Sequence, residues 1–288
     1  MTERRHPDWI KVRAPTSPEY FRTKALLAEL RLHTVCQEAC CPNIGECFSH
    51  RTATFMLMGD VCTRNCPYCA VAHGKVRPLD PDEPRRIAEA VARLGLDHVV
   101  VTSVDRDDLT DGGAALFAAT IRAIREQSPR TTIEVLTPDF QGNHDALRTV
   151  MAETPEIFNH NVETIGRLYR RVRPKADLKQ SLELLRAAKR MEARSRTKSG
   201  LMVGLGEEMD EVKELLRDMR AHDVEIVTIG QYLRPSLKHH PLIRFWTPDE
   251  FAELKDYGKS LGFAHVESGP LVRSSYHAHE QAVAATAV

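Results

Sequence analysis

The chain has 288 residues, 42% of them hydrophobic and 28% charged, which is enough for one large α/β domain or two smaller ones. Its 40 basic and 40 acidic residues give a formal net charge of zero, so no basic field points to nucleic acid or an anionic membrane. No apolar run reaches the ~20 residues of a membrane span, and residues 1–15 lack the apolar core of a secretory signal. We therefore expect a cytoplasmic protein.

Six segments along the chain read as buried β-strands, because they are rich in β-branched residues and bounded by turn residues. Amphipathic helical patterns separate them. Ile87, Val91 and Leu94 share one helical face, with Pro84 near its start and Gly95 just past its end. Two more helices are marked by Leu178, Leu182 and Leu185, and by Leu215, Leu216 and Met219. The predicted strands are 52–59, 97–104, 131–138, 155–163, 196–204 and 224–232.

Six βα units in a row predict a parallel sheet with right-handed crossovers. Because a closed barrel of this kind has eight such units, we expect an α/β fold with a partial, open (β/α)6 TIM-like barrel. In such folds the chemistry lies at the carboxyl ends of the strands. The predicted core spans 52–230, with an N-terminal extension over 1–51 and a C-terminal extension over 231–288.

The cysteines are unevenly distributed. All seven lie between Cys36 and Cys69, and their number is odd. A disulfide framework is typical of small secreted domains, whereas dense cysteine clusters in a reducing compartment more often hold metal. The pattern therefore predicts metal sites.

The stretch CTRNCPYC (62–69) follows the first predicted strand and places Cys62, Cys66 and Cys69 on one loop. A zinc ion held by these thiolates and His73 is one interpretation. The other is a [4Fe–4S] cluster with three protein ligands and one open iron, which can bind S-adenosylmethionine. The spacing CX3CXφC, with Tyr68 as the aromatic φ, resembles the signature of the radical SAM superfamily. That resemblance implies that Tyr68 lies near the adenine.

A second triad lies upstream, where Cys36, Cys41 and Cys47 fit CX4CX5C. Cys40 allows an alternative CX3C spacing from Cys36. Buried free cysteines are common, so we interpret Cys40 as a packed thiol rather than a ligand. Two zinc sites, each lacking one thiolate, would be a coincidence, which counts further against the zinc interpretation.

Together these motifs resemble the lipoyl synthase family over almost the whole chain. The resemblance implies that the upstream triad holds a second [4Fe–4S] cluster, whose remaining iron is bound by a serine of the RSSY motif. We assign Ser275, next to Tyr276, with Ser274 as the alternative. An oxygen ligand matches this soft iron less well than thiolate, so this iron should leave most easily. The resemblance rests on CX4CX5C, CX3CX2C, GECF (45–48), VVVTSVDRDDLTDGGA (99–114), FNHNVET (158–164), SGLMVGLGE (199–207), QYLRPS (231–236) and SGPLVRSSYHA (268–278).

The resemblance also implies the reaction and the partners. Two sulfurs are inserted at C6 and C8 of an octanoyl chain bound to a lysine, with the auxiliary cluster as sulfur donor and one S-adenosylmethionine per hydrogen abstraction. The carrier is a lipoyl domain of a 2-oxoacid dehydrogenase E2 subunit or the H protein of glycine cleavage. An electron donor and an iron–sulfur carrier protein are further partners. We expect a monomer that binds neither nucleic acid nor membrane.

Polar residues at the ends of the predicted strands are candidates for binding S-adenosylmethionine. They are Ser103, Asp105, Asn161, Glu163 and Glu207. For each of three segments another interpretation stays open. For the loop containing Asp105 the alternative is a capped loop before a helix, for Glu163 a cap of the next helix, and for the GLGE turn before Glu207 a turn that only begins a helix.

Two other classes of protein compete with this interpretation. A different radical SAM enzyme that inserts sulfur would keep the downstream triad. A zinc-stabilised nucleic-acid or protein-binding module would instead require a basic patch and four-ligand sites. The cationic stretch RRVRPK (170–175) is interpreted as a solvated face, with docking of an acidic carrier as the alternative.

Overall fold

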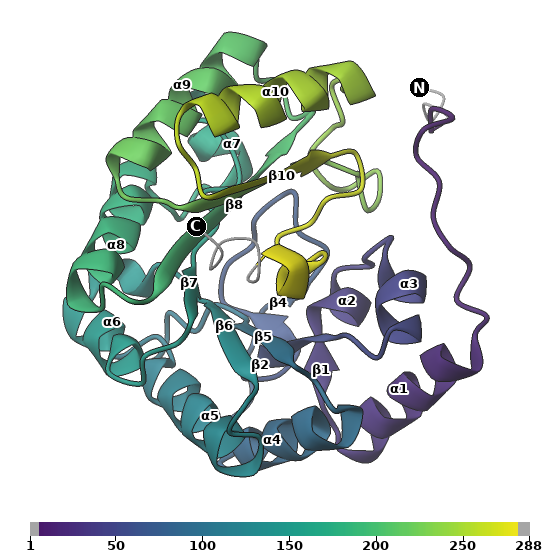
Figure 1. Cartoon of the computed structure of the whole chain (residues 1–288), viewed down its shortest axis with the longest axis vertical. Helices are drawn as coiled ribbons and strands as arrows, with labels where there is room; N and C mark the ends of the chain where they lie inside the picture. The colour runs from purple at the N-terminus through teal and green to yellow at the C-terminus, as the bar shows by residue number, and fades with distance from the viewer. Residues whose placement is uncertain (1–5, 282–288) are drawn as a thin grey trace.

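The computed structural model describes residues 6–281 and contains one eight-stranded sheet. Figure 1 shows the strands curving around a central space with helices on their outer side. The seven strands from β2 to β10 in this sheet run parallel, and β1 pairs antiparallel with β2 at one end. In order across the sheet the strands are β1 (His33–Thr34), β2 (Thr54–Leu57), β5 (His98–Ser103), β6 (Thr132–Leu136), β7 (Ile157–Asn159), β8 (Arg196–Val203), β9 (Ile226–Gln231) and β10 (His265–Gly269).

The predicted α/β fold with an open, partial barrel is confirmed, since β1 and β10 lie at opposite ends of the sheet order. All six predicted strands form and pair in parallel. The six predicted βα units are present, since each of these strands is followed by a helix, and β10 adds a seventh parallel strand on β9 within the C-terminal extension. Its sequence HVESG is polar and only Val266 is fully buried, so it lacks the apolar run of a central strand.

Helices cover the outer face of the sheet, as expected for right-handed βα crossovers (Figure 1). The predicted helix at 87–94 ends at Gly95, whose φ of 66° lets it cap the carboxyl end in the left-handed region. The helices are α1 (Pro18–Glu29), α2 (Val35–Glu38), α3 (Ile44–Ser49), α4 (Glu83–Leu94), α5 (Ala114–Gln127), α6 (His144–Met151), α7 (Tyr169–Val172), α8 (Leu178–Met191), α9 (Met209–Ala221) and α10 (Pro248–Ser260), with 3-10 turns at η1 (Phe140–Gly142) and η2 (Gly166–Leu168).

The predicted extensions are continuous with the core. β1 belongs to the N-terminal extension and β10 to the C-terminal one, and both pair with core strands. The division at 51 and 230 therefore stays a prediction about function, and parts of both extensions (1–5 and 282–288) lie outside the described residues. Within the described part, no helix is long and apolar enough to cross a membrane.

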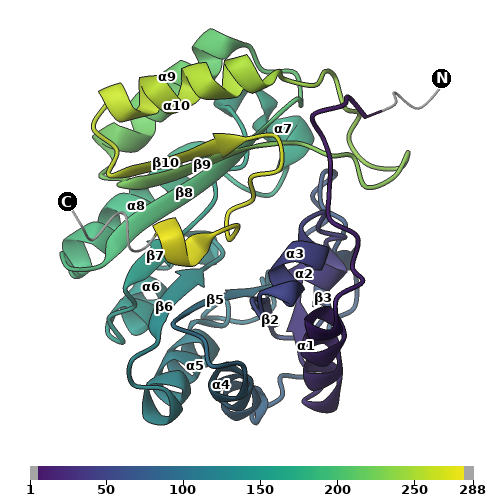
Figure 2. The same ribbon diagram turned by 45° about the vertical axis from the view of Figure 1, so that its right-hand side comes forward.

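After β10 the chain turns back across the inner side of the sheet (Figures 1 and 2). We call residues 271–276 the C-terminal strap. The Asn43 side chain donates to the Leu271 carbonyl at 2.7 Å, and the Tyr276 hydroxyl donates to Glu46 at 3.2 Å. These contacts bring the RSSY motif beside α2 and α3, which carry two of the upstream cysteines.

Beneath the strap, the barrel interior holds a fully buried ion pair. Lys198 Nζ lies 2.9 Å from Glu134 Oε2, and neither side chain is exposed. The Asn159 amide donates to the other Glu134 oxygen at 2.7 Å and also to the Ser274 hydroxyl at 2.9 Å. The strap is therefore connected through Asn159 to the charged centre of the barrel.

Candidate active site

The predicted site residues converge on one cavity of about 520 Å³ at the carboxyl ends of the strands. The cavity is lined from four distant parts of the chain: the N-terminal extension, the loop after β2, the ends of β5 and β7, and the strap. The predicted residues that line it are Cys36, Cys41, Cys47, Cys62, Tyr68, Cys69, Ser103, Asp105, Asn161, Glu163, Ser274 and Ser275.

The downstream triad lies on the loop that follows β2. This loop begins in β3 (Val61–Cys62), which pairs with β4 (Ala72–His73). The Arg64 amide donates to Cys62 Sγ at 3.3 Å, and the Cys69 amide donates to the Cys66 carbonyl at 3.0 Å. Cys66 itself does not line the cavity, although Asp105 and Glu163, which do, act on its thiol electrostatically.

The thiols of this loop are buried together. Burial raises the pKa of Cys62 and of Cys66 to about 11, and that of Cys69 to about 12. Cys62 and Cys66 also raise the pKa of Cys69 through their charge. Three thiolates in one buried place therefore need a compensating cation, and metal binding is the usual way to drive such thiols to ionise.

The upstream triad lines the same cavity from the N-terminal extension. Cys36 is in α2, Cys47 is in α3 and Cys41 is in the segment between them. Burial raises the pKa of Cys47 to about 12, and Cys36 and Cys41 raise it further by their charge. The two thiol triads, each lacking a fourth sulfur, fit the donor chemistry of iron–sulfur clusters. No group of three or more His, Cys, Asp or Glu side chains within residues 6–281 is arranged to hold a single metal ion, so the fit rests on donor type.

The two serines of the RSSY motif point to different neighbours. The Ser275 hydroxyl lies 2.7 Å from Thr54 Oγ1, and Thr54 is also a hydrogen-bond partner of Cys36. Ser274 accepts a hydrogen bond from Asn159 and donates one to Asn161 Oδ1 at 3.0 Å. Ser275 is therefore next to the upstream thiols, whereas both hydrogen-bonding directions of Ser274 are directed to the end of β7.

Several polar groups in the cavity offer contacts to a ligand. The Ser103 hydroxyl is buried and has no protein partner, as expected of a group that binds a ligand. Asp105 Oδ2 lies 3.7 Å from Cys62 Sγ. Burial raises the pKa of Glu163, which also receives hydrogen bonds from Asn161 and Tyr68. Serine, carboxylate and phenol groups thus border the downstream triad.

Glu207 lies elsewhere. Its carboxylate accepts hydrogen bonds from the backbone amides of Gly204 and Leu205, the latter at 3.0 Å, and it does not line the cavity. The open alternative, a glycine turn that begins a helix, agrees with α9 starting at Met209. The contact between Glu207 and S-adenosylmethionine stays a prediction.

Two further interpretations need correction, and the proposed zinc ligand lies away from the site. Cys40 is exposed, so it is not a packed thiol. It has a positive φ of 51° between α2 and α3, which turns its side chain out of the core. Arg173, in the cationic stretch predicted to be solvated, is buried, and it donates to the Asn161 carbonyl at 2.8 Å. His73, the proposed zinc ligand, is exposed on β4 and does not line the cavity.

Sequence reasoning missed the arginines of the site. Arg173 and Arg273 both line the cavity, and both act electrostatically on Glu163. Arg273 also acts electrostatically on Cys41 of the upstream triad. Its place as the first residue of RSSY was the available signal. For Arg173 the local sequence shows only a basic run, and its burial depends on α7 packing near the end of β7.

Comparisons with known proteins agree with this geometry. The model of the Radical SAM superfamily matches residues 56–219, and that of the N-terminal domain of lipoyl synthase matches residues 1–41. The lipoyl synthase of Rubrobacter xylanophilus is 58% identical over 96% of this chain and 86% of its own length. The lipoyl synthase of Nitrosococcus oceani is 58% identical over 100% of this chain and 89% of its own.

Solved structures with low identity support the fold. Methylornithine synthase (PylB) superposes with a TM-score of 0.55 at 15% identity, over 77% of this chain and 72% of its own. SuiB of Streptococcus suis bound to S-adenosylmethionine gives a TM-score of 0.60 at 11% identity, over 79% of this chain and 54% of its own. The fold and the site thus define a radical SAM protein. Within that superfamily, the chain belongs to the lipoyl synthase family.

Proposed function

We propose that the protein carries the activity of its family, the insertion of two sulfurs at C6 and C8 of an octanoyl chain linked to a lysine of a carrier domain. The observation that carries this proposal is the single cavity lined by thiols of both triads and by Ser275. A radical source and a sulfur source in one cavity would both reach the same acyl chain. Two separate cavities would not allow this.

Cys62, Cys66 and Cys69 are the proposed ligands of the radical SAM cluster. When bound, this [4Fe–4S] cluster supplies the electron that splits S-adenosylmethionine into methionine and a 5′-deoxyadenosyl radical. Such chemistry is needed because an unactivated methylene has no acidic proton for a side chain to remove. The chain's own contribution is to hold the nucleoside, the methionine and the acyl chain in place.

Four side chains are proposed to position S-adenosylmethionine. The Ser103 hydroxyl, which has no protein partner, supplies a hydrogen bond, and Asn161 supplies an amide. Glu163 and Asp105 offset the positive charges of the ammonium and sulfonium groups. Tyr68 is assigned to the adenine by family resemblance, and burial raises its pKa well above the usual value, so the phenol keeps its proton.

The auxiliary cluster is the proposed sulfur substrate. Cys36, Cys41, Cys47 and Ser275 are its proposed ligands. A serine oxygen binds this soft iron less firmly than a thiolate would, so the iron on Ser275 is the first to leave when sulfur is removed. The cluster must then be rebuilt, which requires an iron–sulfur carrier protein.

The remaining partners belong to the same proposal. The substrate is an octanoylated lipoyl domain of a 2-oxoacid dehydrogenase E2 subunit or of the glycine cleavage H protein. An electron donor reduces the radical SAM cluster. The enzyme is proposed to act as a cytoplasmic monomer.

The direct test is the mass of an octanoyl-lysyl peptide after anaerobic incubation with the reconstituted, reduced protein and S-adenosylmethionine. We expect a shift that matches two added sulfurs without added sulfide. Cys40→Ala is the matched control, since Cys40 is a thiol at the cavity outside both triads, and it should leave the shift unchanged. An unchanged peptide with fresh 5′-deoxyadenosine would favour another radical SAM enzyme. The absence of both products would overturn the proposal.

A further inference from the structure

The most extensive ionic contact of the downstream loop involves Arg64, which lies between two of its cysteines. The Arg64 side chain is only 4% exposed. Nε and Nη2 donate to the two oxygens of Asp107 at 2.8 and 2.9 Å. Nη1 and Nη2 donate to the two oxygens of Asp139 at 3.0 and 2.6 Å. One guanidinium thus binds two carboxylates, each in bidentate geometry, and we call these three residues the Arg64 clamp.

Both carboxylates belong to loops that end neighbouring strands, β5 and β6. The Asp139 side chain is 1% exposed, and the Gln141 backbone amide donates to its Oδ1 at 3.0 Å. Burial alone would raise the pKa of Asp139, but hydrogen bonds and charge from Arg64 lower it to about 2. The carboxylate is therefore ionised, and it has a fixed position.

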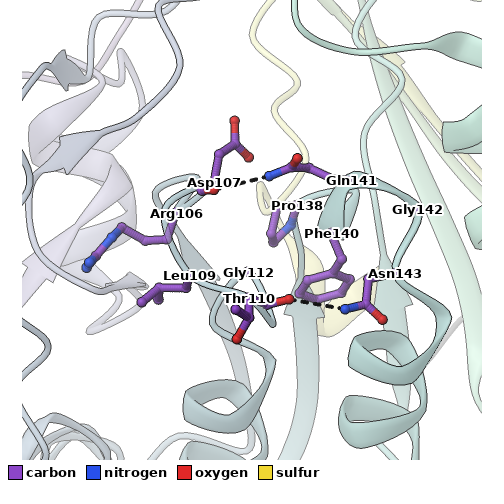
Figure 3. A pocket seen from close by; sticks show the side chains of 10 residues that line it. All are labelled: Arg106, Asp107, Leu109, Thr110, Gly112, Pro138, Phe140, Gln141, Gly142 and Asn143. Carbon is purple, nitrogen blue, oxygen red and sulfur yellow. Dashed lines mark hydrogen bonds between the residues drawn. The ribbon is translucent and has the colours of Figure 1, made fainter.

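The two loops are also tied to each other. Figure 3 shows the pocket of about 330 Å³ between them, crossed by two hydrogen bonds. The Gln141 side-chain amide donates to the Asp107 carbonyl at 3.4 Å, and the Asn143 side-chain amide donates to the Thr110 carbonyl at 3.2 Å. The clamp is therefore held on a frame that spans two strand ends.

The backbone of the cysteine loop is joined to the same frame. The Thr63 amide donates to the Asp105 carbonyl at 3.0 Å, and the Asp107 amide donates to the Thr63 hydroxyl at 3.0 Å. The Arg64 side chain is fixed by the two carboxylates, and the Thr63 backbone is fixed by Asp105. In this arrangement the Arg64 backbone amide donates to Cys62 Sγ at 3.3 Å. Amide hydrogen bonds to cluster sulfurs raise reduction potentials, so this orientation matters chemically.

We propose that Arg64 is a positioning residue, which holds the loop of Cys62, Cys66 and Cys69 in its metal-binding form through Asp107 and Asp139. Arg64 touches neither substrate nor cofactor and acts through the loop backbone. Lysine cannot replace it fully, because an ammonium lacks the planar fork that binds two carboxylates at once. This inference rests on the proposed role of the downstream triad.

The first test uses the full-length, metal-free chain, so it needs no catalysis. Alkylation of each cysteine by iodoacetamide is followed by mass spectrometry for the wild type, Arg64→Gln, Arg64→Lys and the control Arg86→Gln. Arg86 is a comparably buried arginine on α4, which pairs with Asp80 at 3.0 Å and donates to the Leu30 carbonyl. Urea unfolding of each variant checks that it is folded.

We expect Arg64→Gln to speed alkylation of Cys62, Cys66 and Cys69 about tenfold while Cys36, Cys41 and Cys47 keep the wild-type rate. Arg64→Lys should fall between, and Arg86→Gln should leave the ratio of the two triads unchanged. Equal acceleration at both triads, or none, overturns the clamp. If Arg64→Lys protects the three cysteines from alkylation as well as the wild type does, the bidentate geometry is not needed, and that part of the proposal is overturned.

The second test uses a chain loaded at the downstream site only, through the triple substitution Cys36→Ala, Cys41→Ala and Cys47→Ala. Iron loss to a chelator should be about 10–100-fold faster with Arg64→Gln, as found when groups that orient metal ligands are removed. The reduction potential of the cluster should also shift. An unchanged rate and potential would reject the clamp, while a lack of sulfur insertion by the wild type would reject only the proposed function.

Discussion

The two cysteine sites of this protein are assembled differently. The downstream triad comes from one loop of eight residues, 62–69, and is braced by a buried arginine with two carboxylates. The upstream triad depends on a strap more than 200 residues away, which is joined to it by hydroxyl and amide hydrogen bonds such as Thr54–Ser275 and Asn43–Leu271. A charge-braced loop suits a permanent cluster. A site closed by the hydroxyl of Ser275, as proposed above, would suit a cluster that is dismantled in each turnover.

The strongest test of this contrast removes one thiol from each site. Cys66→Ala should abolish both 5′-deoxyadenosine and lipoyl product, because the cluster that cleaves S-adenosylmethionine loses a ligand. Cys41→Ala should abolish sulfur insertion while 5′-deoxyadenosine still forms. Both products are measured by mass spectrometry after anaerobic turnover. Sulfur insertion by the Cys41 variant would remove the distinction between the sites.

The serine pair tests the labile ligand at the upstream site. Ser275→Ala should reduce sulfur insertion by ~10–100-fold with S-adenosylmethionine cleavage preserved, because one iron would lose its proposed oxygen ligand. Ser274→Ala is the matched control, and loss of its two hydrogen bonds should cost only about 1 kcal/mol each. Iron content and product per chain decide between them. A larger loss in the Ser274 variant would reverse the assignment.

The buried ion pair beneath the strap should dominate stability. Lys198→Met leaves the Glu134 carboxylate buried without its cation and should cost ~3–5 kcal/mol of unfolding free energy. The double variant Lys198→Met, Glu134→Leu should recover most of that loss, since no charge is then left unpaired. Urea unfolding of both variants checks this. Equal losses in the two would show that packing, not charge, is responsible.

The free energy of unfolding should also depend on pH through the same ion pair. Burial alone would raise the pKa of Glu134, but the charge of Lys198, the nearby His98 ring and a hydrogen bond from Asn159 lower it from 4.5 to about 2. The stabilisation is therefore complete above pH 4.5 and is lost as pH falls toward 2. Urea unfolding from pH 6 to pH 3 should show a smaller decline in the double variant. Parallel declines would exclude this carboxylate as the cause.

The smallest expected effect concerns Gly230, against which the C-terminal strap packs. A Cβ at Gly230 would lie 2.1 Å from the Val272 carbonyl oxygen, so Gly230→Ala must displace the strap and should cost ~1–3 kcal/mol. Gly269→Ala is the control, because its Cβ would meet Val272 at an ordinary 3.4 Å. Thermal unfolding and upstream cluster content should both fall only for Gly230→Ala. If iron falls equally at both triads, the strap is not specific to the upstream site.

Local patterns in the sequence were enough for much of this architecture. The six core strands and the predicted helices follow from apolar periodicity, which is a short-range property. The two thiol triads follow from cysteine spacing, and their position after a strand end from the rule for parallel sheets. Strand β10 escaped this reasoning because Glu267 and Ser268 make it too polar to read as buried.

Side-chain direction was harder to predict. Glu207 follows a strand end like Glu163, yet it turns back onto the amides of Gly204 and Leu205. Cys40 has a positive φ and is exposed, whereas its neighbour Cys41 is partly buried. Neither outcome is encoded in the spacing of residue types, because both depend on which backbone groups lack partners after folding.

The sequence by itself determined the kinds of ligand, their spacing and the strands that carry them, because these depend on neighbours along the chain. The tertiary structure decided that Ser275 rather than Ser274 points to the upstream thiols, and that Arg64 meets Asp107 and Asp139. These choices rest on hydrogen bonds between residues 43 to 221 positions apart, whose energies exist only once the strands have brought the partners together.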